Sequence, residues 1–316
     1  MNRGRCLVTG SEGYIGQALI KSLVESGLFT SVIGIDKVET AEIVADITSP
    51  IDLGDRLDGQ FDSCVHLAAV AKEPGYELAE YYDVNHRGTL NVLDLCDQLG
   101  VSTVIFTSTM MVFPAGENRY DEACQVAPDT SYGGSKALAE RDVLAWGARQ
   151  SNRRVVVLRP GVVFGLNDTG NFDRMRRALA AGRFAYIGRR DTIKSCVHVL
   201  DVVGFIQAAL LRPDINGIYH IAFPQSPRID EIVAATQLSL GIQRWVPQVP
   251  YRVAIFITGL CNFLGLFRPY DLHPRRIQKL NRSTNILADR WTRSGYHMRF
   301  RTLGEACAAW GRESSL

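Results

Sequence analysis

The chain has 316 residues, 46% of them hydrophobic and 22% charged, which is enough for one large domain or for a domain with a smaller partner. Its 35 basic and 33 acidic side chains leave a net charge of +2, which argues against nucleic acid or anionic lipid as a partner. Seven cysteines without a Cys-x-x-Cys pair indicate reduced thiols in the cytoplasm, with neither disulfides nor a metal site. The first apolar run is too short for a signal peptide, so we expect no export.

Short β-branched runs alternate with amphipathic segments through the first half of the chain. Continuously apolar strands of this kind are buried on both faces. The alternation therefore predicts an α/β fold with a doubly wound, Rossmann-type parallel sheet. The predicted strands are Cys6–Thr9, Ser31–Ile35, Ser63–Leu67, Thr103–Thr107 and Val155–Leu158, and the predicted helices are Tyr14–Ser26, Asn85–Leu99 and Tyr132–Gln150.

Three glycines separate the first predicted strand from the first predicted helix. Gly10 allows a tight turn, Gly13 lets the backbone approach a pyrophosphate, and Gly16 lets the helix pack on the strand. The helix N-terminus adds amide donors and the positive end of its dipole. This context predicts a dinucleotide site, and a glycine-rich turn without a ligand is the alternative.

Asp36 ends the second predicted strand, about 20 residues after Gly16. A carboxylate there accepts hydrogen bonds from an adenosine ribose and repels a 2′-phosphate. NAD is therefore favoured over NADP, although the adjacent Lys37 weakens that preference. A surface carboxylate at a strand end is the alternative.

Tyr132 and Lys136 form a Tyr-x-x-x-Lys pattern at the start of a predicted helix, where one turn brings the ammonium beneath the phenol. A phenol is a poor base at neutral pH, and a neighbouring cation lowers its pKa. The hydroxyls that follow the preceding strand, at Ser108 and Thr109, are placed to bind the same substrate oxygen. Together these residues predict acid–base chemistry at a hydroxyl or carbonyl group.

With these motifs the chain resembles the extended short-chain dehydrogenase/reductase family. Within that family it resembles the NAD-dependent sugar epimerase/dehydratase group. Several spaced motifs in the right order carry the resemblance over nearly the whole chain. They are residues 9–16 (TGSEGYIG), Asp36, residues 45–47 (ADI), residues 66–69 (HLAA), Asn85 with Gly88-Thr89, residues 108–113 (STMMVF), Tyr132 with Lys136, residues 158–160 (LRP), residues 197–199 (VHV) and Asp201-Val202.

The resemblance implies roles for individual residues. Tyr132 is the acid–base, Lys136 lowers its pKa and binds the nicotinamide ribose, and Thr109 binds the reacting oxygen. A buried strand end is the alternative for residues 66–69, and a helix N-cap for Asn85. Besides Tyr132 and Lys136, the implied cofactor contacts are Gly10, Gly13, Tyr14, Ile15, Gly16, Asp36, Lys37, Asp46, Ile47, Leu67, Ala68, Ala69, Asn85, Thr107 and Pro160.

The residues after Thr109 narrow the reaction. In sugar enzymes of this family, a C4 hydroxyl loses its proton to the tyrosine as hydride passes to NAD. The 4,6-dehydratases then use an Asp-Glu pair, whereas this chain has Met110 and Met111, which cannot move protons. A 4-epimerase or a 4-ketoreductase remains, and NAD specificity at Asp36 favours the epimerase.

After Pro160 the alternation weakens, and glycines, prolines and arginines become frequent. We expect residues 1–160 to form an NAD-binding Rossmann domain. Residues 161–316 are expected to form mainly a smaller, less regular substrate-binding lobe. Segments around 195–222, with a helix near Leu200–Leu211 and a strand at Gly217–Ile221, are expected to return to the main sheet.

The predicted substrate contacts are weaker than the cofactor contacts. Val162 stands where related nucleotide-sugar enzymes often carry an Asn, and Lys194 stands where they carry an Arg, so that it offers only a point charge. A solvated basic face is the alternative for Arg189. The full predicted set is Ser108, Thr109, Met110, Val162, Lys194 and Arg189.

The apolar run Val253–Phe267 is shorter than the ~18 to 20 residues that span a bilayer. We favour a buried helix or a dimer contact. A lid over a lipid-like substrate and an interfacial helix flanked by Arg252 and Arg268 are the alternatives. Relatives with such a run include 3β-hydroxysteroid dehydrogenase-like enzymes and some bacterial polysaccharide enzymes.

These observations predict a cytoplasmic, NAD-dependent 4-epimerase or 4-ketoreductase of a nucleotide sugar. The resemblance implies a homodimer that pairs through the helices at 85–99 and 132–150. No nucleic acid partner is expected, and membrane association is left open only for Val253–Phe267. The alternatives are a 3β-hydroxysteroid dehydrogenase-like oxidoreductase acting on a hydrophobic alcohol and a non-catalytic dinucleotide-binding subunit.

Overall fold

The computed structural model describes residues 3–51, 59–73, 75–263, 278 and 280–313. Within these residues a parallel sheet of seven strands forms the centre, in the order β11-β7-β5-β4-β1-β2-β3. The predicted doubly wound α/β fold is therefore confirmed. The strands are β1 (Arg3–Thr9), β2 (Phe29–Asp36), β3 (Ile43–Val44), β4 (Ser63–His66), β5 (Thr103–Thr107), β7 (Arg154–Pro160) and β11 (Gly217–Ile221).

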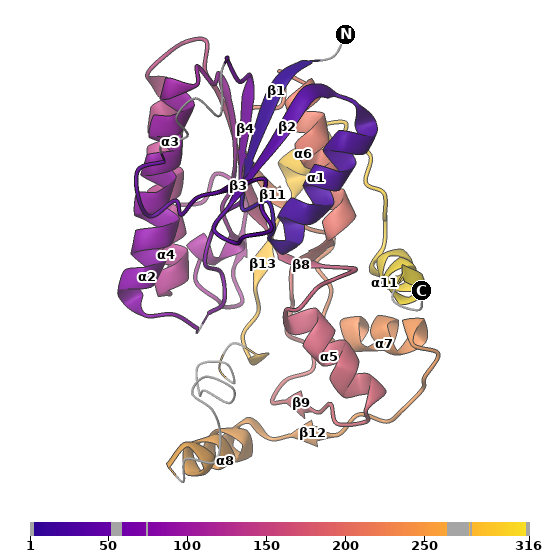
Figure 1. Ribbon diagram of the computed structural model, residues 1–316. Helices are drawn as coiled ribbons and strands as arrows, with labels where there is room; N and C mark the ends of the chain where they lie inside the picture. The colour runs from indigo at the N-terminus through magenta and orange to yellow at the C-terminus, as the bar shows by residue number, and fades with distance from the viewer. Residues whose placement is uncertain (1–2, 52–58, 74, 264–277, 279, 314–316) are drawn as a thin grey trace.

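Helices cover both faces of this sheet (Figure 1). On one face α1 (Tyr14–Ser26) packs beside α6 (Val199–Leu211), and their apolar residues share a core with β1 and β7. On the other face lie α2 (Leu78–Tyr82), α3 (Gly88–Gln98) and α4 (Ser131–Ala148), with a second core beneath α3 and α4. Burial on both faces explains why the central strands are continuously apolar.

The predicted helix Asn85–Leu99 begins differently in the structure. A π-helical turn, η2 (Asp83–Arg87), joins α2 to α3, and Asn85 lies inside that turn. Its buried side chain accepts a hydrogen bond from Val70 N (2.8 Å) and donates one to Val70 O (3.0 Å). The N-cap interpretation of Asn85 is therefore wrong, because its amide is held by the chain after β4. Single π-helical turns inside helices are frequent at functional sites.

A second lobe lies below the sheet in Figure 1. Its core is formed mainly by three helices, α5 (Asn171–Ala180), α7 (Ile229–Ser239) and α11 (Leu303–Glu313). Two short strands, β8 (Val162–Phe164) and β10 (Cys196–His198), pair beside it. The remaining elements are η3 (Met110–Val112), β6 (Arg119–Tyr120), β9 (Tyr186–Ile187), β12 (Gln248–Val249), α8 (Tyr251–Phe263), β13 (Asn285–Ile286) and α10 (Asp289–Arg293).

The chain passes between the two parts of the molecule more than once. After β10 it forms α6 and then β11, which joins the main sheet beside β7. β10 itself pairs with β8 in a separate two-stranded sheet. The domain limits at residues 160 and 161 stay a prediction.

The apolar run Val253–Phe267 falls mostly on α8. Of its side chains, Ala254 is buried, whereas Val253, Phe256 and Ile257 are exposed. The expectation of a buried helix is therefore wrong for the described part of the run, and residues 264–267 lie outside the described residues. Among the described helices, none combines the length and the apolar character needed to cross a bilayer.

Candidate active site

The glycine turn lies between β1 and α1. Gly10 has a φ of +71°, and a Cβ on it would lie 2.6 Å from the backbone nitrogen of Ala68. A Cβ on Gly16 would lie 2.0 Å from the Gly10 carbonyl oxygen. Both positions therefore exclude a side chain. Gly13 differs, because it is exposed and a Cβ there would meet only the Gly10 carbonyl oxygen, at 3.1 Å.

Asp36 leaves the end of β2 and turns toward this loop. Its Oδ2 accepts a hydrogen bond from Glu12 N (3.1 Å), and its Oδ1 accepts one from Lys37 N (2.7 Å). The carboxylate is half-buried, and Lys37 is exposed. The turn and the carboxylate are thus side by side, which is the arrangement that a dinucleotide requires.

Asp46 and Ile47 follow β3 at the same side of the sheet. Asp46 is exposed, and a hydrogen bond from the Thr48 backbone lowers the pKa of its carboxyl below the usual range. Ile47 is buried against Gly88, and its carbonyl accepts a hydrogen bond from Asn91 Nδ2 (2.7 Å). The pair therefore forms a fixed turn at the sheet edge beside α3.

The segment after β4 is held in place from both ends. Leu67 N donates to Thr9 O (3.0 Å), and Ala68 lies against Gly10. Asn85 fixes Val70, and its Nδ2 also donates to Ser135 Oγ on α4 (3.0 Å). Leu67 and Ala68 are half-buried and Ala69 is exposed along this segment. Asn85 is therefore a positioning residue that ties the segment to the residue before Lys136.

Tyr132, Lys136 and Thr109 come together at the start of α4. The hydroxyl of Thr130 caps this helix by accepting a hydrogen bond from Gly133 N (3.0 Å). Tyr132 and Lys136 follow one turn apart on the buried side. Thr109 is also buried, its hydroxyl accepts a hydrogen bond from Met111 N (3.2 Å), and it acts on the Tyr132 phenol by lowering that group's pKa. The structure thus joins the hydroxyl after β5 to the predicted acid–base.

Burial shifts the pKa of both members of this pair. It raises the pKa of Tyr132 to about 12, and the Thr109 hydroxyl only partly opposes that rise. Burial also lowers the pKa of Lys136 to about 7, against the attraction of Glu140. The Lys136 ammonium lies over the Phe106 ring, 4.1 Å from its centroid. The lowering of the Tyr132 pKa by Lys136 together with the charge of bound NAD stays a prediction.

A buried ion pair lies behind the site. Arg159 on β7 binds Glu140 on α4, and both side chains are almost fully buried. Ser108 Oγ donates to Glu140 Oε2 (2.8 Å), so its hydroxyl points away from the site. This contact weakens the case for Ser108 as a substrate contact, which stays a prediction. The adjacent Thr107 has a buried Oγ1 without a hydrogen-bond partner among the described residues.

His66 is a site residue to which the sequence analysis assigned no role. It bridges Thr9 Oγ1 (2.6 Å) and Thr89 Oγ1 (2.9 Å) through its two ring nitrogens. Burial and the charge of Lys136 lower its pKa to about 3, so the ring is neutral at physiological pH. Its place in the motif at residues 66–69 was visible, but its two partners lie far away in the sequence.

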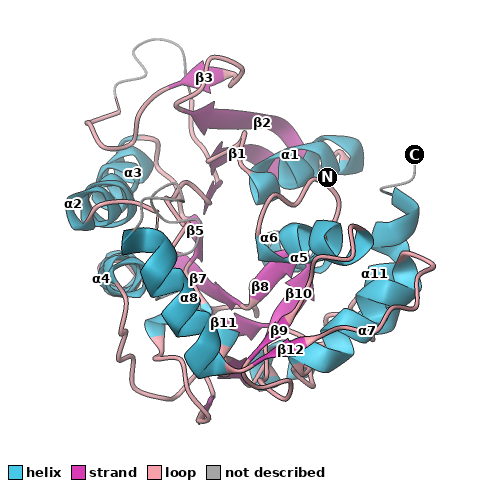
Figure 2. Ribbon diagram, turned by 90° about the horizontal axis from the view of Figure 1, so that it is seen from below, coloured by secondary structure: helices cyan, strands magenta, loops and turns pink. Residues whose placement is uncertain are grey.

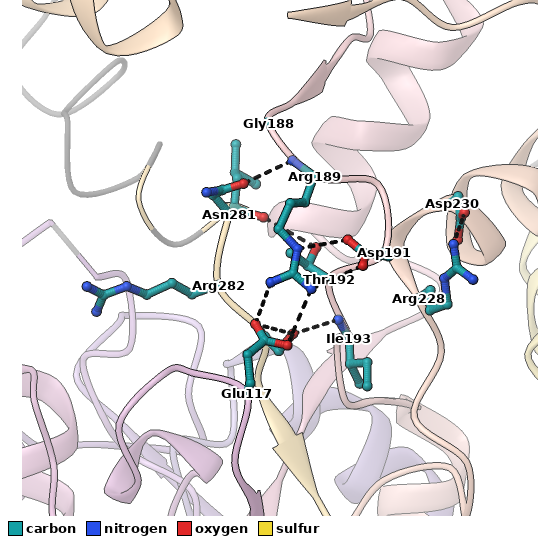
Figure 3. A network of polar contacts seen from close by, with 12 residues as sticks. Glu117, Gly188, Arg189, Asp191, Thr192, Ile193, Arg228, Asp230, Asn281 and Arg282 are labelled. Carbon is teal, nitrogen blue, oxygen red and sulfur yellow. Dashed lines mark hydrogen bonds and ion pairs between the residues drawn. The ribbon is translucent and has the colours of Figure 1, made fainter. Parts of the chain in front are cut away.

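Both predicted substrate cations have partners within the chain, and Figure 3 shows those of Arg189. Arg189 Nη1 donates to Glu117 Oε1 (2.9 Å), and its Nε donates to Asp191 Oδ1 (2.8 Å). Lys194 Nζ donates to the carbonyl of Arg282. Both cations are thus already engaged, which weakens the case for a phosphate contact at either.

Other predicted contacts line the neighbouring elements. Val162 and Met110 are half-buried, and Val162 N donates to Ser195 O (2.8 Å). Tyr14 and Ile15 are half-buried at the start of α1, and Pro160 is buried at the end of β7. A valine in β8 offers no side-chain hydrogen bond. The loss of a polar substrate contact at Val162 stays a prediction.

Arg282 is a cation that the sequence analysis did not consider. Its side chain is 57% exposed, and its nearest recorded ion-pair contact is Asp129 Oδ2, at 4.0 Å. Asp129 comes three residues before Tyr132, so Arg282 reaches from the second lobe toward the start of α4. Figure 3 shows its guanidinium pointing away from the cluster around Arg189. No local motif marks this arginine.

Comparisons with known proteins agree with this geometry. The profile of the NAD dependent epimerase/dehydratase family matches residues 6–222. The N-acetyl-alpha-D-glucosaminyl-diphospho-ditrans,octacis-undecaprenol 4-epimerase of Escherichia coli O157:H7 is 27% identical over 300 residues, which cover 92% of this chain and 89% of the relative. The human decarboxylating sterol-4-alpha-carboxylate 3-dehydrogenase is 29% identical over 216 residues, which cover 65% of this chain and 57% of the relative.

A solved structure supports the fold. MoeE5 in complex with UDP-glucose and NAD superposes with a TM-score of 0.77 at 24% identity and covers 99% of both chains. At that identity the likeness shows the fold alone. Together with the family match, it confirms the predicted resemblance, and the predictions of an enzyme and of NAD dependence are confirmed at the level of the family.

Proposed function

The chain belongs to the NAD dependent epimerase/dehydratase family, and we propose that it is a 4-epimerase of a diphosphate-linked hexose in which Tyr132 is the acid–base. The observation that carries this proposal is the buried Tyr132 on α4, one turn before the buried Lys136, with the Thr109 hydroxyl acting on its phenol. Met110 follows Thr109, and a thioether cannot transfer the protons that a dehydration requires. The epimerase half-reaction needs only one group that gives and takes a proton.

The residues present fit NAD. The exposed Gly13, without a side chain, would let a diphosphate approach the backbone of the turn, and Asp36 is placed for the adenosine ribose. At the other end, the unpartnered Thr107 hydroxyl would take up a hydrogen bond from the bound cofactor. Bound NAD would supply the hydride acceptor for the sugar C4.

The chain's own residues would handle the proton. Tyr132 would remove the proton of the C4 hydroxyl and later return it, while Thr109 would hold the reacting oxygen. Because burial raises the pKa of Tyr132 to about 12, a positive charge beside the phenol is needed to favour phenolate at neutral pH. Lys136, whose pKa is about 7, would supply part of that charge when protonated.

We infer that the sugar is carried on a polyprenyl diphosphate. The Escherichia coli relative acts on such a substrate and aligns over nearly the whole length of both chains. The sequence predicted contacts to a nucleoside diphosphate at three residues. Those contacts are weakened here, because Arg189 and Lys194 have internal partners and Val162 is apolar. The exposed Arg282, which lies 4.0 Å from Asp129 before the start of α4, would offer a cation for a diphosphate on this side.

The test is an incubation with NAD in deuterated water. The substrates are N-acetylglucosaminyl diphosphoundecaprenol and, in parallel, UDP-N-acetylglucosamine. Transient oxidation at C4 predicts the galacto epimer without deuterium at C4, because the same hydride returns. Deuterium at C4, or NADH that accumulates with a keto product, would contradict an epimerase. Preference for the nucleotide sugar would contradict the proposed carrier alone.

Two further expectations belong to the same proposal. We infer a homodimer formed through α3 and α4, which lie side by side on the outer face of the sheet and expose Leu90. Light scattering of the purified protein tests it, because a monomeric mass would contradict the dimer. A location in the cytoplasm stays a prediction.

A further inference from the structure

The lower end of the second lobe carries an exposed apolar helix face. Val253, Phe256 and Ile257 on α8 are 46%, 72% and 49% exposed. Their spacing places them on one side of the helix, while Ala254 faces the protein and is 7% exposed. We call these three residues the α8 face. Figure 2 views the molecule from this end, and α8 lies nearest the viewer.

An exposed tryptophan precedes this helix. Trp245 is 85% exposed and lies in the segment that joins α7 to β12, and β12 leads directly into α8. This segment, β12 and α8 together form the lower edge of the molecule in Figure 1. Tryptophan favours the boundary between water and lipid, because its ring is apolar and its N–H is polar.

Charge is concentrated in the same part of the chain. Residues 232–288 contain seven Lys and Arg side chains and a single acidic one, so the segment has a formal net charge of +6. The whole chain has a net charge of only +2, and the rest of it is therefore net negative. Arg252 is exposed directly beside the α8 face. The overall charge balance concealed this cationic segment in the sequence analysis.

The α8 face is coupled to the substrate side of the site. β12 pairs with β9, and Gln248 Nε2 donates to Gly188 O (2.6 Å). Tyr251, the first residue of α8, packs close to Gly188. Arg189, which follows Gly188, donates its backbone N–H to Asn281 Oδ1 (2.9 Å). This bond links the segment to the cluster shown in Figure 3. Binding of α8 to a surface would therefore also restrict the motion of the substrate lobe.

We propose that the α8 face and Trp245 seat the protein on an anionic lipid bilayer. Phe256 and Ile257 enter the boundary between headgroups and acyl chains, and Arg252 meets the lipid phosphates. An apolar face beside the exposed Arg252, in a segment of formal net charge +6, fits such a surface in both polarity and charge. The inference rests on the proposed function, because a sugar on a polyprenyl diphosphate is presented at the membrane surface.

Vesicle flotation of the full chain tests this surface. We expect the wild type to float with vesicles of phosphatidylcholine and phosphatidylglycerol, and less with phosphatidylcholine alone or at raised salt. The double variant Phe256→Ser/Ile257→Ser should lose about tenfold or more of its vesicle partitioning. The matched control is Val24→Ser on α1, which is 62% exposed and far from α8, and it should float like the wild type.

Three results would overturn the inference. They are wild-type protein that does not float, a double variant that floats undiminished, and a double variant whose oligomeric mass falls, which would assign α8 to a contact between copies. The double variant is taken as folded when its NAD content and thermal midpoint equal those of the wild type. If it does not fold, the single variant Phe256→Ser is tested in its place. Flotation needs no turnover, so an inactive protein that floats would break the proposed function and leave this surface intact.

Discussion

The helices α4 and α8 differ in which side chains they bury. Polar side chains are usually exposed and large apolar ones buried, and each helix breaks one of these two rules. α4 buries the polar side chains of Tyr132, Lys136 and Glu140, whereas α8 exposes Phe256 and Ile257. Lysine and glutamate are almost never fully buried without a partner, and contiguous exposed apolar side chains mark contact surfaces. Each departure costs stability locally, so each points to function. The first indicates chemistry inside the protein, and the second indicates a contact outside it.

The partners of the two helices differ accordingly. Glu140 is held by Arg159 and Ser108, and the Lys136 ammonium lies over Phe106. All of these partners come from within the chain. In the part of the chain that the structure describes, the α8 face remains in contact with solvent. The buried polar groups of α4 are stabilised by partners within the chain. The exposed α8 face, by contrast, needs a surface outside the chain to cover it.

The largest expected effect is at Tyr132. Tyr132→Phe removes the hydroxyl and keeps the ring that packs near Tyr81. We expect kcat to fall about 10² to 10⁴-fold, the range that one positioned acid–base supplies. NAD content and the thermal midpoint should stay at the wild-type values. Undiminished turnover in this variant would break the assignment of chemistry to α4.

The buried ion pair should govern stability. Glu140→Ala leaves the buried Arg159 charged and without a carboxylate partner, which we expect to cost about 3 to 5 kcal/mol in the free energy of unfolding. Urea denaturation measures this loss in the free energy of unfolding. The matched control is Asp214→Ala, which breaks the exposed pair with Arg212 and should leave the midpoint unchanged. Equal midpoints for the two variants would show that burial on α4 carries no special cost.

Lys136 should make stability depend on pH. Its pKa is about 7 in the folded protein and 10.5 in the unfolded chain, so the unfolded state binds more protons between these values. Stability relative to Lys136→Met should therefore rise from pH 7 upward, by at most about 1.4 kcal/mol per pH unit for one proton. Urea denaturation of the NAD-free proteins between pH 7 and ~9 measures the difference. A constant difference would mean that the folded lysine keeps its ordinary pKa.

The features predicted well are those that local sequence determines. The glycine turn was predictable because Gly13 and Gly16 are limited by the Gly10 carbonyl within the turn itself, although the limit at Gly10 comes from the distant Ala68. Tyr132 and Lys136 share a face because they are four residues apart on one helix. The central strands were visible because burial on both faces makes them continuously apolar.

The features missed depend on distant partners. Arg189 meets Glu117, which is 72 residues away, and Ser108 meets Glu140, which is 32 residues away. Neither contact leaves a local pattern. The composition of α8 is the same whether the helix is buried or exposed, so the run Val253–Phe267 could not by itself reveal its surroundings. The lowered pKa of Lys136 also left no local pattern, because its burial is a property of the folded core.

The smallest expected effect tests the orientation of Ser108. Its hydroxyl donates to Glu140, so Ser108→Ala should lower the free energy of unfolding by about 1 kcal/mol, because Arg159 still satisfies the carboxylate. The KM for the sugar substrate should stay within about twofold of the wild type, since the side chain points away from the site. A raised KM with unchanged stability would instead place Ser108 among the substrate contacts. It would also weaken the contrast between the helices, because a group counted as internal support for α4 would belong to the substrate.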